Sequence, residues 1–277
     1  MNPESIKAKL LNIAQIEKEV FQELLNRYGG EQFLARLSQS AYANKFIFKG
    51  GSLLTYLLDS KRKTRDLDFL IRHISNKVND ATRIIQEIIV IRLDDGLTWL
   101  APEGKSLNHP TMDYPGVRFR CPFKLGTAKG FVHMDLAIGD EVNAVRRSLK
   151  RIRYKDKPFI GPDFELFVYP PETIFSEKLQ IAMDRGIKNT RMKDYYDLFK
   201  LVQLDVLNTV EIQQSIQNTF EKRGMSFHPS IDFDEQTMKR LQTYWATFLR
   251  KLNITDAPER LSEVIHKVNC KLKDIYQ

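Results

Sequence analysis

The residues best suited to chemistry are a glycine-rich turn and a pair of aspartates that follows it. Gly50-Gly51-Ser52 comes directly after a short apolar run, and the sequence TRDLDF begins at residue 64. Alternate side chains of an extended strand share one face, so Asp66 and Asp68 should project together. Magnesium commonly takes one or two carboxylates and completes its shell with phosphates and water. The pattern therefore predicts phosphoryl or nucleotidyl transfer.

The glycine turn should bind the phosphates. A strand, a Gly-Gly-Ser turn and a helix start would expose backbone N–H groups at the positive end of a helix. We expect Gly50 and Gly51 in this turn and Ser52 as the N-cap of a helix over residues 53–58. Arg65, the last residue of the basic run 61–65, is a further candidate for nucleotide binding. An ordinary capped turn is the alternative for the Gly-Gly-Ser sequence.

A third acid, Asp135, lies in an alternating segment at residues 130–138. Its period places it on the same face as His133. On a strand beside the first pair, Asp135 would either complete a two-metal site or accept a proton from an attacking hydroxyl. A structural aspartate near the end of a strand is the alternative.

The second half of the chain offers a lysine and an acid on two predicted helices. Lys178 and Arg185 are seven residues apart and share a helix face. Asp194 begins the next helix, where Arg191 and Asp197 recur at three-residue steps. A lysine directed at a nucleotide would bind the triphosphate, with the aspartate holding it in place. A salt-bridged surface is the alternative.

Hydrophobic periodicity divides the 277 residues into a mixed α+β half (1–168) and a helical half (169–277). In the first half we expect helices at 3–28, 31–40, 53–58 and 77–94, separated at Gly29-Gly30 and elsewhere by loops. Strands are predicted at 45–48, 64–71, 116–123, 130–138 and within 158–168. Helices should follow at 172–185, 192–203, 210–223, 234–252 and 258–276. The fold class is therefore a mixed sheet flanked by helices, with a C-terminal helical bundle.

The composition indicates which class of partner the chain could bind. The chain has 43 Lys and Arg against 35 Asp and Glu, a net charge of +8, and basic runs at 61–65 and 146–157. Such clusters can bind phosphates and steer a nucleic acid, although a solvated surface has the same composition. Two distant cysteines give neither a disulfide framework nor metal-ligand spacing. We expect a cytoplasmic protein without a signal peptide or a membrane span.

Five motifs occur together in one order: KGGSLL from residue 49, RDLDF from 65, the strand around Asp135, SEKL from 176 and RMKDYYDL from 191. Together they resemble the AbiEii-type nucleotidyltransferases, which include the toxins of type IV toxin–antitoxin systems and the MenT toxins. The likeness spans about residues 45–200. It implies a DNA-polymerase-β-like core with a helical C-terminal part that completes the active-site cleft.

The resemblance also assigns roles. Gly51 and Ser52 match the family's first motif, Asp66 and Asp68 its metal pair, Lys178 its nucleotide-contacting lysine and Asp194 the acid of its last motif. It implies Mg²⁺ or Mn²⁺ as cofactor and a nucleoside triphosphate (NTP) as substrate.

The resemblance implies as acceptor the 3′ end of tRNA, so that aminoacylation and translation are blocked. A cognate antitoxin is implied that acts without a stable complex. Alternative acceptors are a small molecule or a protein hydroxyl. A non-catalytic nucleotide-binding regulator is a further alternative.

Overall fold

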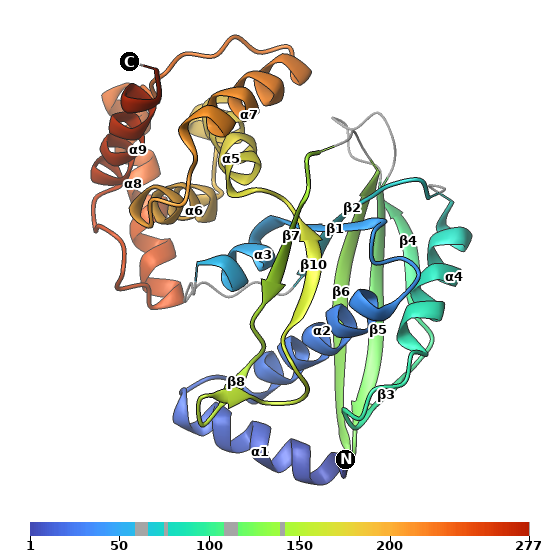
Figure 1. The fold of residues 1–277 in the computed structure, drawn as a ribbon. Helices are drawn as coiled ribbons and strands as arrows, with labels where there is room; N and C mark the ends of the chain where they lie inside the picture. Colours follow the sequence, from blue (N-terminus) through green and yellow to red (C-terminus); the bar gives the residue numbers. More distant parts are fainter. Residues whose placement is uncertain (59–65, 75–76, 108–115, 139–141, 277) are drawn as a thin grey trace. The chain divides into compact units, whose positions relative to one another are not determined.

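The computed structural model describes residues 1–58, 66–74, 77–107, 116–138 and 142–276 (Figure 1). It contains two compact units. Most of residues 1–169 form the first unit, and Pro170–Gln277 belong to the second.

The first unit is built on a mixed sheet. Within the described residues its strand order is β3-β5-β6-β2-β1-β10-β7, and β4 pairs with β5. The pairs β1–β10 and β2–β6 are parallel, whereas β1–β2, β5–β6 and β7–β10 are antiparallel. The strands are β1 (Phe46–Lys49), β2 (Asp66–Ile71), β3 (Leu97–Trp99), β4 (Glu103–Leu107), β5 (Gly116–Leu125), β6 (Ala128–Ile138), β7 (Val145–Leu149) and β10 (Phe164–Val168), with a small β8–β9 hairpin (Arg153–Tyr154 and Lys157–Pro158).

Helix α2 (Phe21–Gln39) is continuous through Gly29-Gly30, so the predicted break at this pair is wrong. The break occurs earlier, between α1 (Pro3–Ile16) and α2. A Cβ on Gly29 would overlap the ring of Phe123 on β5. The glycine therefore serves the close approach of α2 to the sheet and does not end the helix.

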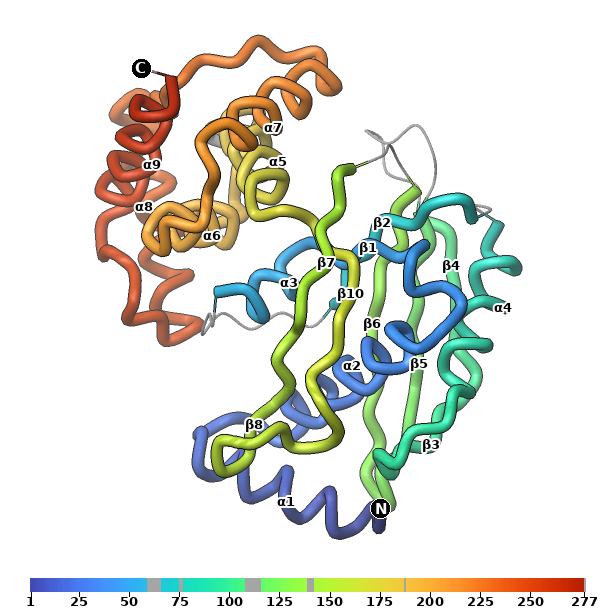
Figure 2. The backbone as a smooth tube through the Cα atoms, in the orientation of Figure 1, coloured from blue at the N-terminus to red at the C-terminus, as the bar shows by residue number. Residues whose placement is uncertain are grey.

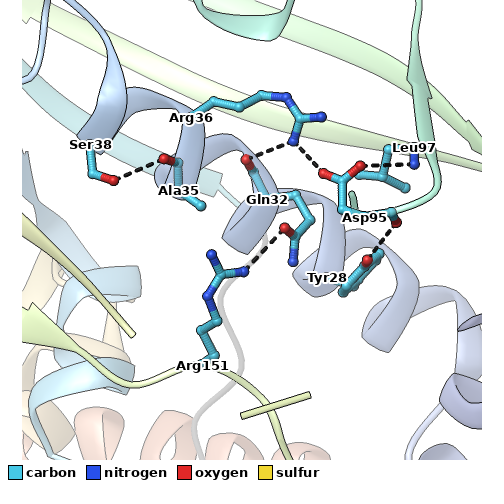
Figure 3. Close-up of polar contacts among 8 residues, drawn as sticks. All are labelled: Tyr28, Gln32, Ala35, Arg36, Ser38, Asp95, Leu97 and Arg151. Atoms are coloured by element: carbon cyan, nitrogen blue, oxygen red, sulfur yellow. Dashed lines mark hydrogen bonds and ion pairs between the residues drawn. The ribbon is translucent and has the colours of Figure 1, made fainter. Parts of the chain in front are cut away.

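A buried polar network ties α2 to its surroundings (Figure 3). Arg36 forms an ion pair with Asp95, and Arg36 and Asp95 are 2% and 1% exposed. The Tyr28 hydroxyl donates to the Asp95 carbonyl at 2.7 Å. Arg151 donates to the side-chain oxygen of Gln32 at 3.1 Å. Because buried charges are stable only when paired, this network fixes the position of α2 on the sheet.

Glu31, also on α2, is a buried acid with a perturbed proton affinity. Both of its carboxylate oxygens accept from the Ile152 N–H at 2.9 Å. Burial raises the pKa of Glu31 to about 7, and the nearby charges of Arg27 and Arg151 only partly oppose this, while Asp163 adds to it. The backbone within the basic run 146–157 is therefore anchored to the core at Ile152 by buried polar contacts.

Two further helices complete the first unit. The backbone passes directly from β1 into α3 (Gly50–Leu57), as Figure 2 shows. Helix α4 (Val78–Ile89) packs against β4 through its apolar face. That face carries Ala81, Ile84, Ile85 and Ile88, in agreement with the predicted periodicity.

The second unit is helical. Its helices are α5 (Pro171–Arg185), α6 (Met192–Gln203), α7 (Thr209–Lys222), α8 (Glu235–Leu252) and α9 (Leu261–Tyr276), with a 3-10 turn at Gly186–Lys188. Helix α6 packs on α5 and α9, and it is almost wholly buried. No helix among the described residues is both long and apolar enough to cross a membrane. The predicted class, a mixed sheet with flanking helices and a C-terminal helical bundle, is confirmed.

Candidate active site

Strand β2 presents its two aspartates on one face, as the alternation predicts. Asp66 and Asp68 are half-buried, while Leu67 and Phe69 between and after them are buried. Phe69 packs against Phe33 of α2 with ring centroids 6.3 Å apart. The apolar residues thus hold the strand on the core, and the carboxylates point to the opposite face.

The glycine turn abuts this pair directly. Lys49, the last residue of β1, is the cross-strand partner of Asp68, and Gly50 follows with φ +73°. A Cβ on Gly50 would overlap the Asp68 carboxylate. Only glycine therefore combines this left-handed backbone with a carboxylate held against the turn.

Ser52 lies within the first turn of α3, because the helix begins at Gly50. The predicted N-cap role is therefore wrong, since an N-cap residue precedes the helix. Its side chain is buried, and its Oγ has no hydrogen-bond partner within the part of the chain that the structure describes. A buried hydroxyl of this kind suits a ligand that supplies the missing partner.

Asp135 on β6 lies directly beside Asp68 in the parallel register. Both of its carboxylate oxygens accept from Arg118 of β5, at 2.7 and 2.6 Å. The hydrogen bonds to Asp135 raise the pKa of Arg118, so the guanidinium stays charged. Asp135 could therefore act as a metal ligand or base only after its hydrogen bonds with Arg118 are broken. His133, the cross-strand partner of Asp66, places its Nδ1 3.5 Å from an Asp66 oxygen.

The donor set fits a magnesium ion that arrives with its substrate. Within the described ranges, no three His, Cys, Asp or Glu side chains are arranged as a preformed metal site. Asp66 and Asp68 nevertheless offer two same-face carboxylates, and Asp68 is pressed against a turn with room only for glycine. Magnesium prefers such a partial protein shell, because it keeps waters and phosphate oxygens as its remaining ligands.

In the second unit, Lys178 of α5 lies between two acids of α6. Its Nζ is 2.9 Å from Asp194 and 2.7 Å from Asp197. Arg191 approaches the other oxygen of Asp194 at 3.0 Å. The side chain of Asp194 is fully buried and that of Lys178 is 9% exposed. The expected pair is thus part of a buried ionic cluster.

Two opposing effects act on Asp194. Burial alone would raise the pKa of its carboxyl, but the charges of Lys178, Arg191 and Lys193 outweigh burial and hold the pKa below its usual value. Asp194 is therefore ionised at neutral pH, and Lys178 is held by it.

The structure brings Gly50, Asp66, Asp68 and Asp135 together in the first unit, and it joins Lys178 to Asp194 in the second. Arg65 lies outside the described residues. Sequence reasoning gave no role to Arg118, although alternation in β5 places it on the face of Asp135. It noted Asp197 only as a helical neighbour, whereas the structure makes it a second partner of Lys178.

The model of the family described as "Nucleotidyl transferase AbiEii toxin, Type IV TA system" matches residues 32–267. The chain belongs to this AbiEii family. It is thus a nucleotidyltransferase of a toxin–antitoxin type, and the family implies an NTP substrate and a cognate antitoxin. The suspected resemblance to AbiEii enzymes is confirmed.

Solved structures agree in fold with the AbiEii assignment. JHP933 from Helicobacter pylori superimposes with a TM-score of 0.52 at 13% identity, over 92% of each chain. A Helicobacter pylori protein provisionally described as a nucleotidyltransferase gives 0.53 at 14% identity, over 92% of this chain and 95% of that chain. No curated protein matches the chain significantly in sequence.

Proposed function

We propose that this AbiEii protein is a Mg²⁺-dependent toxin that transfers a nucleoside monophosphate from an NTP to the 3′ end of tRNA and so blocks translation. The observation that carries the proposal is the placement of Asp66 and Asp68 on one face of β2, against the Gly50 turn and in register with Asp135. Carboxylates beside a glycine turn suit a metal-bound triphosphate.

The roles of the turn and of the acid pair follow from this geometry. Gly50, Gly51 and the Ser52 hydroxyl, which has no hydrogen-bond partner among the described residues, would bind the phosphates. Asp66 and Asp68 would hold the metal. Arg65, a candidate from the sequence alone, would add a further phosphate contact. A bound Mg²⁺ would neutralise the triphosphate and make its α-phosphorus more electrophilic. Mn²⁺ offers the same octahedral oxygen chemistry.

The transfer itself is an in-line displacement. The terminal hydroxyl of the acceptor forms a new P–O bond to the α-phosphorus, and the bond to the β-phosphate bridging oxygen breaks, so that pyrophosphate leaves. Asp135, once released by Arg118, would accept the hydroxyl proton or join Asp66 and Asp68 as a ligand.

Lys178 would supply positive charge that stabilises the phosphates in the transition state of the transfer. We propose that Asp194 holds the Lys178 ammonium in its charged form and in a fixed position, so that it can offset negative charge on the phosphates. The 2.9 Å ion pair and the lowered pKa of Asp194 support this role.

A direct labelling experiment tests the function. Purified protein is incubated with each labelled NTP, Mg²⁺ and total tRNA, beside an Asp66→Ala variant. We expect tRNA to be labelled by the wild type and not by the variant. If no nucleotide labels tRNA, the proposed acceptor is wrong; if Asp66→Ala labels as well as the wild type, the metal assignment is wrong.

Salt dependence separates the acceptors. An RNA acceptor should bind less tightly as ionic strength rises, because phosphate contacts release counterions. A small-molecule acceptor would show little of this dependence. The antitoxin is proposed to act without stable binding, and co-purification of the two proteins would contradict this.

A further inference from the structure

The face of the sheet that carries Asp135 also carries a series of cations beyond it. In an antiparallel pair, directly opposite residues share a face. Lys105 of β4 lies opposite Arg118, and Lys124 of β5 lies opposite Lys129 of β6. Arg120 of β5 lies opposite His133. We call Lys105, Arg120, Lys124 and Lys129, with the aromatic Phe131, the basic strip.

The strip is available to a ligand. All four cations are exposed and Phe131 is half-buried. Within the described residues, no ion pair engages Lys105, Lys124 or Lys129. Arg120 has one acidic contact, at 3.6 Å, to the exposed Glu103. The strip thus presents a surplus of positive charge.

Its arrangement is unfavourable without a counter-charge. Like charges at directly opposite positions of an antiparallel pair are destabilising. The strip nevertheless places Lys124 against Lys129, and Lys105 against the already paired Arg118. A polyanion lying across β4, β5 and β6 would relieve both repulsions.

An aromatic ring at the centre of the strip further restricts the class of ligand that it would bind. The Phe131 ring lies 4.8 Å from the His133 ring, and the Arg120 guanidinium lies over it at 4.9 Å. Cations that follow a backbone, combined with an aromatic face that stacks on bases, are the means by which proteins bind single-stranded nucleic acid.

We propose that the basic strip binds the single-stranded end of the RNA acceptor and leads it to Asp66 and Asp68. This inference rests on the proposed function for its choice of ligand. The six steps from Lys129 to Asp135 along β6 span about 20 Å. That length corresponds to about six stacked nucleotides at about 3.4 Å each.

The test measures RNA binding without nucleotide, by fluorescence anisotropy of a labelled tRNA at several salt concentrations. The strip variant combines Lys105→Gln, Lys124→Gln and Lys129→Gln. The matched control combines Lys9→Gln, Lys251→Gln and Lys273→Gln, which removes three exposed lysines elsewhere. Circular dichroism and binding of a fluorescent NTP verify that each protein is folded.

We expect the strip variant to bind at least tenfold more weakly than the control at low salt. Because each phosphate contact on a single strand contributes about 0.7 to the slope of log K against log salt, the loss of three should reduce the slope by about 2. Phe131→Ala should weaken binding by about 5- to 100-fold and leave the slope unchanged, because stacking is not ionic. A 3′-terminal trinucleotide should bind all variants alike.

Equal affinity of the strip variant and the control would overturn the inference, as would a wild type that prefers anionic vesicles to RNA. Labelling and binding can fail separately. If tRNA is labelled but the strip variant binds RNA as tightly as the control, the role proposed for the strip is wrong and the proposed function stands. If the strip variant binds RNA more weakly but no RNA is labelled by the wild type, the proposed acceptor reaction is wrong and the RNA-binding role of the strip is supported.

Discussion

The two candidate clusters differ in how their charges are satisfied. On β2 the side chain of Asp66 is 46% exposed, and the Nδ1 atom of His133 lies 3.5 Å from one of its carboxylate oxygens. In the second unit Asp194 is fully buried and in contact with Lys178 and Arg191. The Asp66 carboxylate is therefore accessible from solvent, whereas Asp194 is part of the protein core. Changes at the two clusters should therefore differ in how much stability they cost.

The largest effect is expected from Asp194→Ala. Removing one partner of a buried ionic cluster leaves an uncompensated charge, which costs about 3–5 kcal/mol of unfolding free energy. Urea denaturation measures the loss. Glu235→Ala is the control, because Glu235 pairs with Lys239 at 3.1 Å and the two side chains are 86% and 80% exposed, so that it should lose at most about 1 kcal/mol. Equal losses of unfolding free energy in the two variants would show that the Lys178 cluster contributes no more to stability than an exposed ion pair.

Asp66→Asn should show the opposite pattern. We expect nucleotide transfer to fall about 100-fold or more, because metal stabilisation of the transition state is worth several kcal/mol. The unfolding free energy should stay within about 0.5 kcal/mol of the wild type, as for other exposed positions. Single-turnover labelling and urea denaturation provide the two numbers. A large loss of stability here would remove the distinction between the clusters.

Buried acids of the two units should also respond to pH with opposite sign. The folded pKa of Glu31 is raised to about 7, so its contribution to stability is present below pH 4.5 and is lost as the pH rises through 7. Relative to Glu31→Gln, the wild type should lose about 2 kcal/mol between pH 5 and 7.

Asp194 has a lowered pKa, so its contribution is present above pH 3.8 and disappears on acidification below that value. The stability gap between the wild type and Asp194→Asn should therefore narrow only in acid. Unfolding curves across the pH range measure both gaps, and a parallel response of Glu31→Gln and Asp194→Asn would contradict the assignment.

Gly50→Ala tests the close approach at the β2 site. Alanine at φ +73° costs about 1 kcal/mol, and its Cβ would also displace the Asp68 carboxylate. Transfer should fall about tenfold, through the Asp68 contact. Gly224→Ala is the control, because Gly224 has φ +61° but no neighbour within 4 Å. If both variants transfer nucleotide normally, the contact with Asp68 has no catalytic importance.

Local patterns were sufficient to predict the acid pair and much of the fold. Alternation of Asp66 and Asp68 with Leu67 and Phe69 fixed both the strand and its exposed face. Periodicity also found the helices of the second unit, because each buries one apolar face. These features depend on neighbours within a few residues.

Features set by distant contacts were missed. Gly29 was misread as a helix break because its packing partner, Phe123, is far away in sequence. The basic strip was missed because alternation in β5 and β6 separates its cations with apolar residues, so no charge run appears. Conversely, the basic run at 146–157 includes Arg151, which is buried, and Arg146 and Arg153, which are paired with acids. Strand β3 has only three residues, and β4 (Glu103–Leu107) has no buried residue, so neither shows a recognisable apolar alternation.

The Arg118–Asp135 pair has a consequence for the enzyme at rest. Three neighbouring carboxylates would repel one another in the absence of a cation, and Arg118 supplies a permanent one. The sheet therefore does not need a bound metal to offset these charges. Under the proposed Mg²⁺ dependence, chelation should stop nucleotide transfer and leave the protein folded and able to bind the metal again.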